Sequence, residues 1–279
     1  MTKTGTKTGT DHVFRQLGVD SAEPVGGGCI HECFRVEIAG RAFFLKCNSK
    51  EQAANFAAEA DGLTALRSAG MRAPEPISHG AAGGKAFLLL ELLSLKQRGD
   101  FAALGRMLAE AHRRPGGRFG WSRDNYIGAT PQANGWCDSW AEFWRERRLK
   151  PQVELAKRNG FDLPVEDLFP LLDGHDPIPS LLHGDLWSGN AGFTEEGPVV
   201  FDPAVYYGDR EADLAMTELF GGFPRELYAA YEKAYPLEPG YQTRKRLYNL
   251  YHLLNHLNLF GAGYLSQVKE TLGLLRRSL

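Results

Sequence analysis

Three oxygen-bearing side chains in the second half of the chain have a spacing that suits phosphoryl transfer. Asp185 precedes Asn190 by five residues in one predicted loop, and Asp202 follows Asn190 by twelve residues at the end of an apolar run. Phosphoryl transfer needs a carboxylate that accepts or orients the proton of the attacking hydroxyl. It also needs an amide oxygen and a second carboxylate that hold Mg²⁺ against the phosphates. Asp185 or Asn190 alone would be ordinary in a solvated turn, but the combined spacing favours a catalytic site.

A pair of charged residues in the first third of the chain suits the other half of such a site. A kinase-type site has a lysine on the α- and β-phosphates of ATP and an acidic side chain, from the following helix, that holds it. Lys46 ends a predicted strand, and Glu59 lies near the middle of the next predicted helix. Glu51 is a weaker candidate, because it lies where that helix begins. Each residue taken alone is more often a solvated surface charge.

Three glycines precede the strand pair that carries Lys46. Gly26, Gly27 and Gly28 would let the backbone approach a phosphate, but they do not complete a Gly-x-Gly-x-x-Gly pattern, and a plain hairpin turn explains them nearly as well. Cys29 follows directly, so its thiol would be open to oxidation and shielded by a bound nucleotide. We hypothesise a redox-sensitive loop; the alternative is a small buried residue in a turn.

Two further segments have side chains or backbone groups suited to ligands. Glu91, Leu92 and Leu93 end a buried strand and open a predicted linker, where backbone groups could bond to an adenine edge; a bare connector is the alternative. Trp187 lies two residues after Asp185. Its indole could stack on a sugar or wedge the loop into the core, and we favour contact with the substrate.

Hydrophobic periodicity and the positions of glycine and proline predict the elements that position these residues. We expect an α+β fold of two lobes: a disordered tail over 1–10, a small strand-rich N-lobe over 11–93 that binds nucleotide, and a mostly helical C-lobe over 94–279 that carries catalysis and the acceptor. A cleft between lobes is a common place for a ligand. The predicted strands are 33–38, 42–46, 86–90 and 198–201, and the predicted helices are 49–69, 101–112, 136–158, 210–219, 225–234 and 241–275, the last broken at 261–263.

Composition and charge exclude other classes of protein. The formal net charge of −2 over 279 residues excludes a strongly basic chain that binds nucleic acid by bulk charge. No apolar run reaches the roughly 18 residues of a membrane span, and the N-terminus lacks the apolar stretch of a secretion signal. The four cysteines contain no Cys-x-x-Cys pair, as is typical of reduced thiols. We expect a cytoplasmic monomer or homodimer without nucleic-acid or membrane partners.

From about Gly26 to its C-terminus the chain resembles the fructosamine/ketosamine kinase family, which belongs with the aminoglycoside phosphotransferase and choline kinase type of protein-kinase-like fold. The continuation Leu186–Asn190 and the triplet Asp202–Ala204 are highly specific for ketosamine kinases. One departure is His31, where relatives often have asparagine. The residues that carry the resemblance are Gly26–Ile30, Phe44–Lys46, His183–Asn190, Asp202–Ala204, Tyr206–Gly208 with Glu211, and Phe220–Phe223.

The resemblance implies an ATP- and Mg²⁺-dependent kinase. Its acceptor would be the 3-hydroxyl of a ketosamine, such as a fructosamine or ribulosamine on an amine or a protein lysine, and the unstable 3-phosphate would then shed the sugar. Two alternatives remain open: a kinase of another amine-bearing molecule of the aminoglycoside or choline type, and a kinase-like binding module without catalysis. The implied roles are a catalytic base for Asp185, Mg²⁺ ligands for Asn190 and Asp202, a phosphate contact for Lys46 held by Glu59, and an adenine hinge for Glu91, Leu92 and Leu93.

Overall fold

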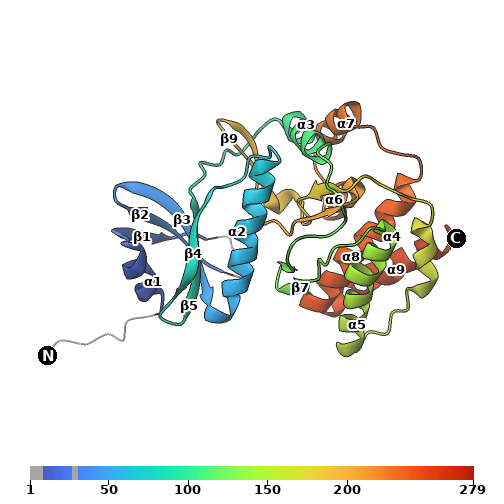
Figure 1. The fold of residues 1–279 in the computed structure, drawn as a ribbon, viewed down its shortest axis with the longest axis horizontal. Helices are drawn as coiled ribbons and strands as arrows, with labels where there is room; N and C mark the ends of the chain where they lie inside the picture. The colour runs from blue at the N-terminus through green and yellow to red at the C-terminus, as the bar shows by residue number, and fades with distance from the viewer. Residues whose placement is uncertain (1–8, 27–30) are drawn as a thin grey trace.

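A computed structural model describes residues 9–26 and 31–279, in which a β-sheet stands beside a larger, mainly helical part (Figure 1). Within these residues the sheet has five antiparallel strands in the order β1-β2-β3-β5-β4. This mixed α+β arrangement agrees with the predicted fold class. The sheet and its two helices comprise α1 (Gly9–Leu17), β1 (Ser21–Pro24), β2 (Glu32–Ile38), β3 (Arg41–Ser49), α2 (Ala53–Ser68), β4 (Pro76–Ala82) and β5 (Lys85–Glu91).

The larger part follows a segment without regular structure over 92–100. In the described residues it holds helices and three short hairpins or strand pairs, β6–β7, β8–β11 and β9–β10. Its elements are α3 (Phe101–His112), β6 (Asn125–Ile127), β7 (Thr130–Gln132), α4 (Trp140–Trp144), α5 (Lys150–Arg158), β8 (Ser180–Leu182), β9 (Ala191–Thr194), β10 (Gly197–Val200), β11 (Tyr206–Gly208), α6 (Arg210–Leu219), α7 (Arg225–Ala234), α8 (Tyr241–Phe260) and α9 (Leu265–Arg276).

The hairpin β2–β3 confirms the predicted strand pair and sets the position of Lys46. Ala39 and Gly40 both have positive φ, which is the geometry of a two-residue hairpin turn. The resulting register places Lys46 opposite Cys33. Because side chains alternate along a strand, Lys46 points to the same face of the sheet as Phe44, the face that α2 covers.

Each face of the sheet is covered by one helix. Val13 of α1 packs with Leu45 and Leu89 on one face, while Phe56 of α2 packs with Leu88 on the other. Figure 1 shows α2 between the sheet and the larger part. Helix α2 therefore contributes to both parts of the molecule.

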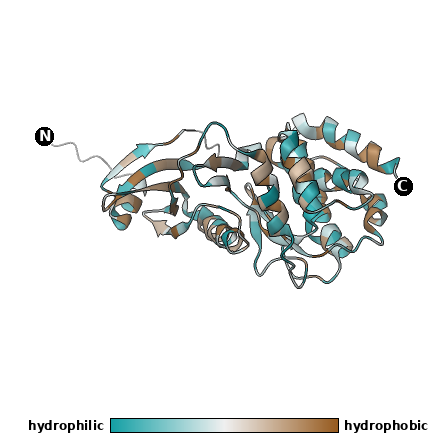
Figure 2. Cartoon of the chain, turned by 90° about the horizontal axis from the view of Figure 1, so that it is seen from above, coloured by the Kyte–Doolittle hydropathy of each residue, from teal (hydrophilic) through white to brown (hydrophobic). Residues whose placement is uncertain are grey.

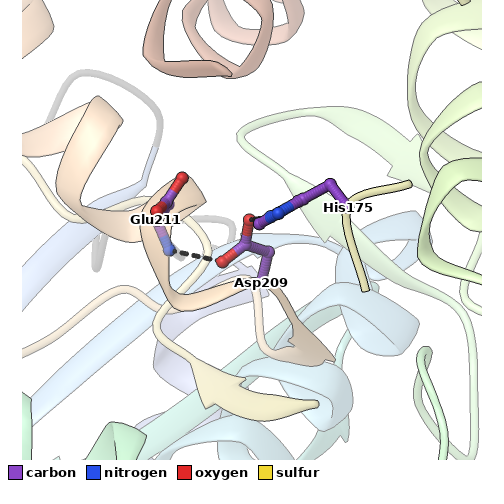
Figure 3. Close-up of side chains that lie close together, drawn as sticks. All are labelled: His175, Asp209 and Glu211. Atoms are coloured by element: carbon purple, nitrogen blue, oxygen red, sulfur yellow. Dashed lines mark hydrogen bonds and ion pairs between the residues drawn. The ribbon is translucent and has the colours of Figure 1, made fainter. Parts of the chain in front are cut away.

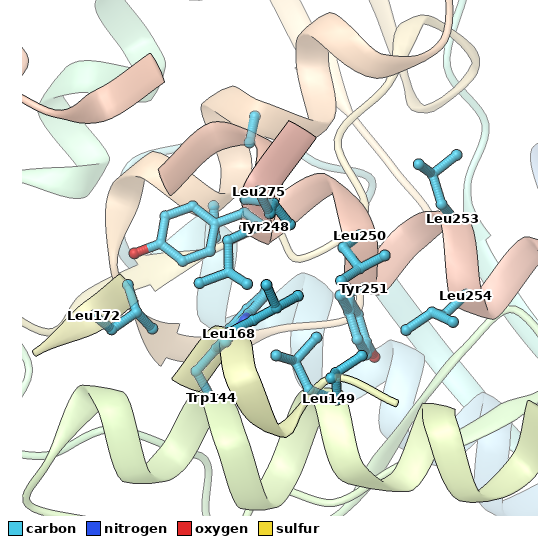
Figure 4. Packing of buried hydrophobic residues seen from close by; sticks show 14 of the residues in the cluster. Trp144, Leu149, Leu168, Leu172, Tyr248, Leu250, Tyr251, Leu253, Leu254 and Leu275 are labelled. Atoms are coloured by element: carbon cyan, nitrogen blue, oxygen red, sulfur yellow. The ribbon is translucent and has the colours of Figure 1, made fainter. Parts of the chain in front are cut away.

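The larger core gathers leucine and aromatic side chains between α8, α4 and α5 (Figure 4). Trp144 and Tyr248 meet edge to face at a centroid distance of 4.8 Å. Figure 2 shows hydrophobic and hydrophilic residues alternating along the helices of this part, as expected of helices with one buried face. No helix in the described ranges is long and apolar enough to cross a membrane.

Several boundaries differ from the predictions, among them those of the tail and of two helices. Residues 9 and 10 belong to α1, so the predicted tail over 1–10 is too long, and Thr10 is buried. The predicted helix over 49–69 begins at Ala53 after a 3₁₀ turn, because the side chain of Ser49 makes no capping hydrogen bond. The predicted helix over 136–158 begins at Trp140, where Ser139 accepts a hydrogen bond from the N–H of Glu142.

That last helix also contains a π-helical segment, Arg145–Leu149, between α4 and α5. Pro151 has no N–H and cannot donate to the carbonyl of Arg147. The side chain of Arg148 donates to this carbonyl instead, at 3.0 Å. The proline thus accounts for the local change of helix type.

Candidate active site

Lys46 connects the sheet, helix α2 and the larger part of the chain. Its ammonium donates to Glu59 Oε1 at 2.6 Å and also to Asp202 Oδ1. Lys46 and Glu59 are both buried, whereas the side chain of Asp202 is 50 % exposed. Glu51, the weaker candidate, is exposed and Glu59 is the residue that contacts Lys46. The predicted pair is therefore brought together, with Asp202 added to it.

The charges in this cluster support one another. Burial would lower the pKa of Lys46, but Glu59 and Asp202 outweigh it and hold that pKa above its ordinary value. Burial would raise the pKa of Asp202, but the charge of Lys46 and its hydrogen bond lower it. The pKa of Asp202 therefore lies below its ordinary value. Lys46 is thus a fixed cation, and Asp202 an anion that is open to solvent.

Asp202 occupies a strained backbone position between β10 and β11. Its φ of 56° lies in the left-handed region, which aspartate tolerates better than most residues. The strand ends at Val200 rather than at 201 as predicted, so Asp202 lies in the loop that follows it. The N–H of Ala204 donates to the carbonyl of His183 at 2.8 Å, which ties this loop to the segment that carries Asp185.

Asp185 and Asn190 lie together in the loop between β8 and β9. Asn190 Nδ2 donates to the carbonyl of Asp185 at 2.9 Å and to Asp185 Oδ2 at 3.3 Å. Burial, and then the charge of Asp202, raise the pKa of Asp185 to about 7. A carboxyl with that pKa is matched to proton transfer near neutral pH.

His183 has a structural role in the loop that carries Asp185. Nε2 lies 3.0 Å from the carbonyl of Phe201, and Nδ1 lies 3.3 Å from the N–H of Asp185. The carbonyl can only accept, so Nε2 carries the proton and Nδ1 accepts. Burial lowers the pKa of His183. A neutral imidazole thus joins the Asp185 loop to the strand end before Asp202.

Asp213 of α6 anchors the same loop, and this contact was not predicted from the sequence. Its carboxylate accepts from the N–H of His183 at 2.7 Å and from the N–H of Gly184 at 2.8 Å. Burial opposes its charge, but the interactions with His112, His183 and the N–H of Gly184 together outweigh burial, so the pKa of Asp213 lies below its ordinary value. Gly184 has a φ of 80°, and a Cβ there would lie 2.1 Å from the carbonyl oxygen of Ala204.

Replacing Asp213 with asparagine is expected to destabilise the protein by about 1–3 kcal/mol, because one of the two buried N–H donors then faces an NH₂ group. We expect kcat to fall while KM for ATP is retained. Thermal unfolding and steady-state kinetics measure both effects. Asp138→Asn, which alters an exposed carboxylate paired with Arg118, is the control. An unchanged melting temperature in Asp213→Asn would contradict the anchoring role.

A buried amide network holds the loop after Asp202 and was also missed from sequence. Asn125 Nδ2 donates to the carbonyl of Val205 at 2.8 Å, and Gln132 Nε2 donates to the carbonyl of Ala204 at 3.1 Å. Tyr251 supports Gln132 through a 2.7 Å hydrogen bond to Oε1. The glycine-rich, irregular sequence around β6 and β7 gives no periodic signal for this network.

The remaining predicted ligand residues lie at the edge of this cluster. Trp187 is 38 % exposed, and its ring covers Gly189, where a Cβ would lie 2.3 Å from the indole. Leu92 and Leu93 are half-buried at the end of β5. The N–H of Glu91 donates to the carbonyl of Glu75, so this N–H is not available to an adenine. Gly27, Gly28 and Cys29 lie outside the described residues.

A second group of potential metal ligands, His175, Asp209 and Glu211, lies at the N-terminus of α6 (Figure 3). The oxygens of this group are already engaged. Asp209 Oδ2 lies 2.8 Å from His175 Nε2 and accepts from Tyr248 at 2.5 Å, and Glu211 accepts two hydrogen bonds from Arg244, at 2.6 and 2.8 Å. The group is therefore an ion-pair network, in which the carboxylate of Glu211 is neutralised by Arg244.

Comparison with known proteins identifies the family. A family model described as fructosamine kinase matches residues 1–277. A probable ketoamine kinase from Synechocystis sp. is 46 % identical over 264 residues, covering 91 % of this chain and 90 % of the relative. A chloroplastic protein-ribulosamine 3-kinase from Oryza sativa subsp. indica is 40 % identical, covering 89 % of this chain and 76 % of the relative.

Solved structures agree with this family. A candidate fructosamine-3-kinase from Haemophilus somnus 129PT has a TM-score of 0.87 at 31 % identity and covers 95 % of each chain. The aminoglycoside phosphotransferase APH(4)-Ia, at a TM-score of 0.62, 14 % identity and 96 % of each chain, shares the protein-kinase-like fold. By its sequence and its structure, the chain belongs to the fructosamine kinase family and is an ATP-dependent kinase.

Proposed function

We propose that this kinase transfers the γ-phosphoryl group of Mg²⁺–ATP to the 3-hydroxyl of a ketosamine. The observation that carries the proposal is the meeting of Lys46 and Asp202 across the two parts of the chain, next to the Asp185–Asn190 pair. The family and the names of the relatives, ketoamine kinase and protein-ribulosamine 3-kinase, support the acceptor class. They favour it over an aminoglycoside or choline, and a catalytic role over binding alone.

In this proposal Lys46 binds the phosphates of ATP and Glu59 holds its ammonium in place. Asp185 orients the 3-hydroxyl and accepts its proton as the new P–O bond forms and the bond to ADP breaks. Most of the rate enhancement would come from positioning and from neutralising charge. Leu92 and Leu93 would border the adenine, and a backbone contact of Gly27 and Gly28 with the phosphates stays a prediction from the sequence.

The donor set fits magnesium. Asp202 supplies a solvent-open carboxylate, and the Nδ2 group of Asn190 is turned to Asp185, which leaves Oδ1 as its free ligand atom. Two protein oxygens suffice, because magnesium keeps several waters and binds phosphate oxygens. When bound, the ion would neutralise charge on the phosphates. In this structure the ammonium of Lys46 balances the negative charge of Asp202.

Trp187 is the residue that we propose for contact with the sugar. Because its ring lies against Gly189 and is partly open to solvent, it offers aromatic surface in the same loop as Asp185. Trp187→Ala is expected to raise KM for the ketosamine about 2- to 10-fold, as loss of one aromatic contact, with KM for ATP unchanged. Trp187→Phe should retain part of the effect. An equal rise in both KM values would contradict the sugar contact.

An acceptor panel tests the proposed function. ATP consumption is measured with Mg²⁺ present or chelated, using fructosamines, ribulosamines and erythrulosamines, both free and on lysine peptides, with an aminoglycoside and choline as comparison. Phosphate position in the product is read by NMR. We expect magnesium-dependent turnover of ketosamines with phosphate on O3. Turnover of choline or the aminoglycoside alone, or no turnover at all, would overturn the proposal.

A further inference from the structure

His31 lies directly before β2, on the face of the sheet that carries Lys46. Continuing the register of β2 on β3 places it opposite Asn48, and its Nδ1 lies 2.9 Å from Asn48 Nδ2. Asn48 and Lys46 are two residues apart in β3, so their side chains share a face. The imidazole packs on Phe56 of α2, with ring centroids 4.9 Å apart. His31 therefore stands beside Lys46 between the sheet and α2.

The hydrogen bonds of Asn48 determine which ring nitrogen of His31 carries the proton. The N–H of Ser49 donates to Asn48 Oδ1 at 2.7 Å, which orients the amide. The NH₂ group of Asn48 therefore faces His31 and donates to Nδ1. A neutral imidazole that accepts at Nδ1 has its proton on Nε2. Burial, and then the charge of Lys46, lower the pKa of His31 to about 4, so the ring is neutral at physiological pH.

The Nε2–H donor is at the edge of the ring turned away from Asn48. Within residues 9–26 and 31–279, no protein group accepts a hydrogen bond from it. The ring also lies close enough to Lys46 and Asp202 to experience the charges of both. A neutral donor adjacent to a fixed ammonium suits an anionic oxygen, because it adds a hydrogen bond without the repulsion that a second cation would meet.

We propose that Nε2–H of His31 donates a hydrogen bond to a phosphate oxygen of the nucleotide, and that Asn48 holds the imidazole in the tautomer that can do so. This inference rests on the proposed function, in which Lys46 binds the same phosphates. It gives His31 a role in nucleotide affinity that is separate from the chemistry at Asp185.

Binding of ATP, ADP and adenosine by calorimetry tests the inference in three variants. His31→Phe keeps the packing on Phe56 but removes the donor, so affinity for ATP should fall about 10- to 100-fold, the range for a hydrogen bond to a charged group. Adenosine, which has no phosphate, should bind as it does to the parent. His31→Gln places an amide donor near the position of Nε2 and should restore most of the affinity. His79→Phe, on exposed β4, is the matched control.

The outcomes separate this inference from the proposed function. If the parent binds ATP and His31→Phe binds it equally well, or if His31→Phe loses adenosine to the same extent, the phosphate contact is wrong and the kinase assignment stands. If the parent binds no ATP, the proposed function fails. Nitrogen-15 NMR of the parent should show the Nε2–H tautomer, and Asn48→Leu should give a mixture of tautomers; an Nδ1–H ring in the parent would overturn the role of Asn48.

Discussion

Asp185→Asn is expected to lower kcat by about 10²- to 10⁴-fold, the usual contribution of a positioned general base. The amide keeps the size of the side chain and can still contact Asn190, but it cannot accept the proton of the acceptor hydroxyl. Affinity for ATP should remain close to that of the parent, because Asp185 contacts the acceptor rather than the nucleotide in the proposed mechanism. Single-turnover kinetics and ATP binding by calorimetry measure the two quantities separately.

The control for this variant is Glu195→Gln, which alters an exposed carboxylate in the turn between β9 and β10 that pairs with Lys96. It should retain the activity of the parent. Full activity in Asp185→Asn would show that another group accepts the proton. Equal loss of ATP binding and turnover would instead place Asp185 in the nucleotide site.

Lys46→Met is expected to affect both catalysis and stability. The phosphates of ATP lose a cationic contact, so kcat/KM for ATP should fall about 10²- to 10³-fold, as when one preorganised donor is removed from a reaction centre. Glu59 is buried and loses its counter-ion. Breaking a buried ion pair on one side costs about 3–5 kcal/mol, which thermal or urea unfolding should reveal.

A double variant separates the two effects. In Lys46→Met/Glu59→Leu the buried pair is replaced by apolar side chains, which is often neutral for stability. The melting temperature should return toward that of the parent, whereas kcat/KM for ATP should stay low. Recovery of activity together with stability would mean that Lys46 acts only by holding the fold.

The sequence predicted the elements whose local signals agree with their tertiary environment. The predicted helices over 101–112, 210–219 and 225–234 match α3, α6 and α7, because each has an apolar face at helical spacing between clear breaks. The hairpin β2–β3 was predicted because apolar and polar residues alternate along its first strand and Ala39 and Gly40 indicate a turn. The pairing of Lys46 with Glu59, rather than Glu51, also followed from helix position alone.

Elements without such signals were not predicted. Strand β4 contains proline, glycine, serine and alanine, which are poor strand formers, and it pairs only because β5 offers its edge. The anchor at Asp213 depends on contacts between residues about thirty positions apart. The network of Asn125 and Gln132 likewise depends on carbonyls far along the chain. Such pairings arise from the assembled fold, and a single sequence contains no local pattern for them.

Helix α2 is fastened to the larger part of the chain at several points. Asp61 accepts a 2.7 Å hydrogen bond from the indole N–H of Trp121. Gly62 allows close packing, because a Cβ there would already lie 3.2 Å from Pro203 and 3.3 Å from Val205. Swinging this helix outward would break these contacts and uncover apolar surface. We therefore expect the enzyme to need no activating modification that moves this helix, since the helix already holds Glu59 against Lys46.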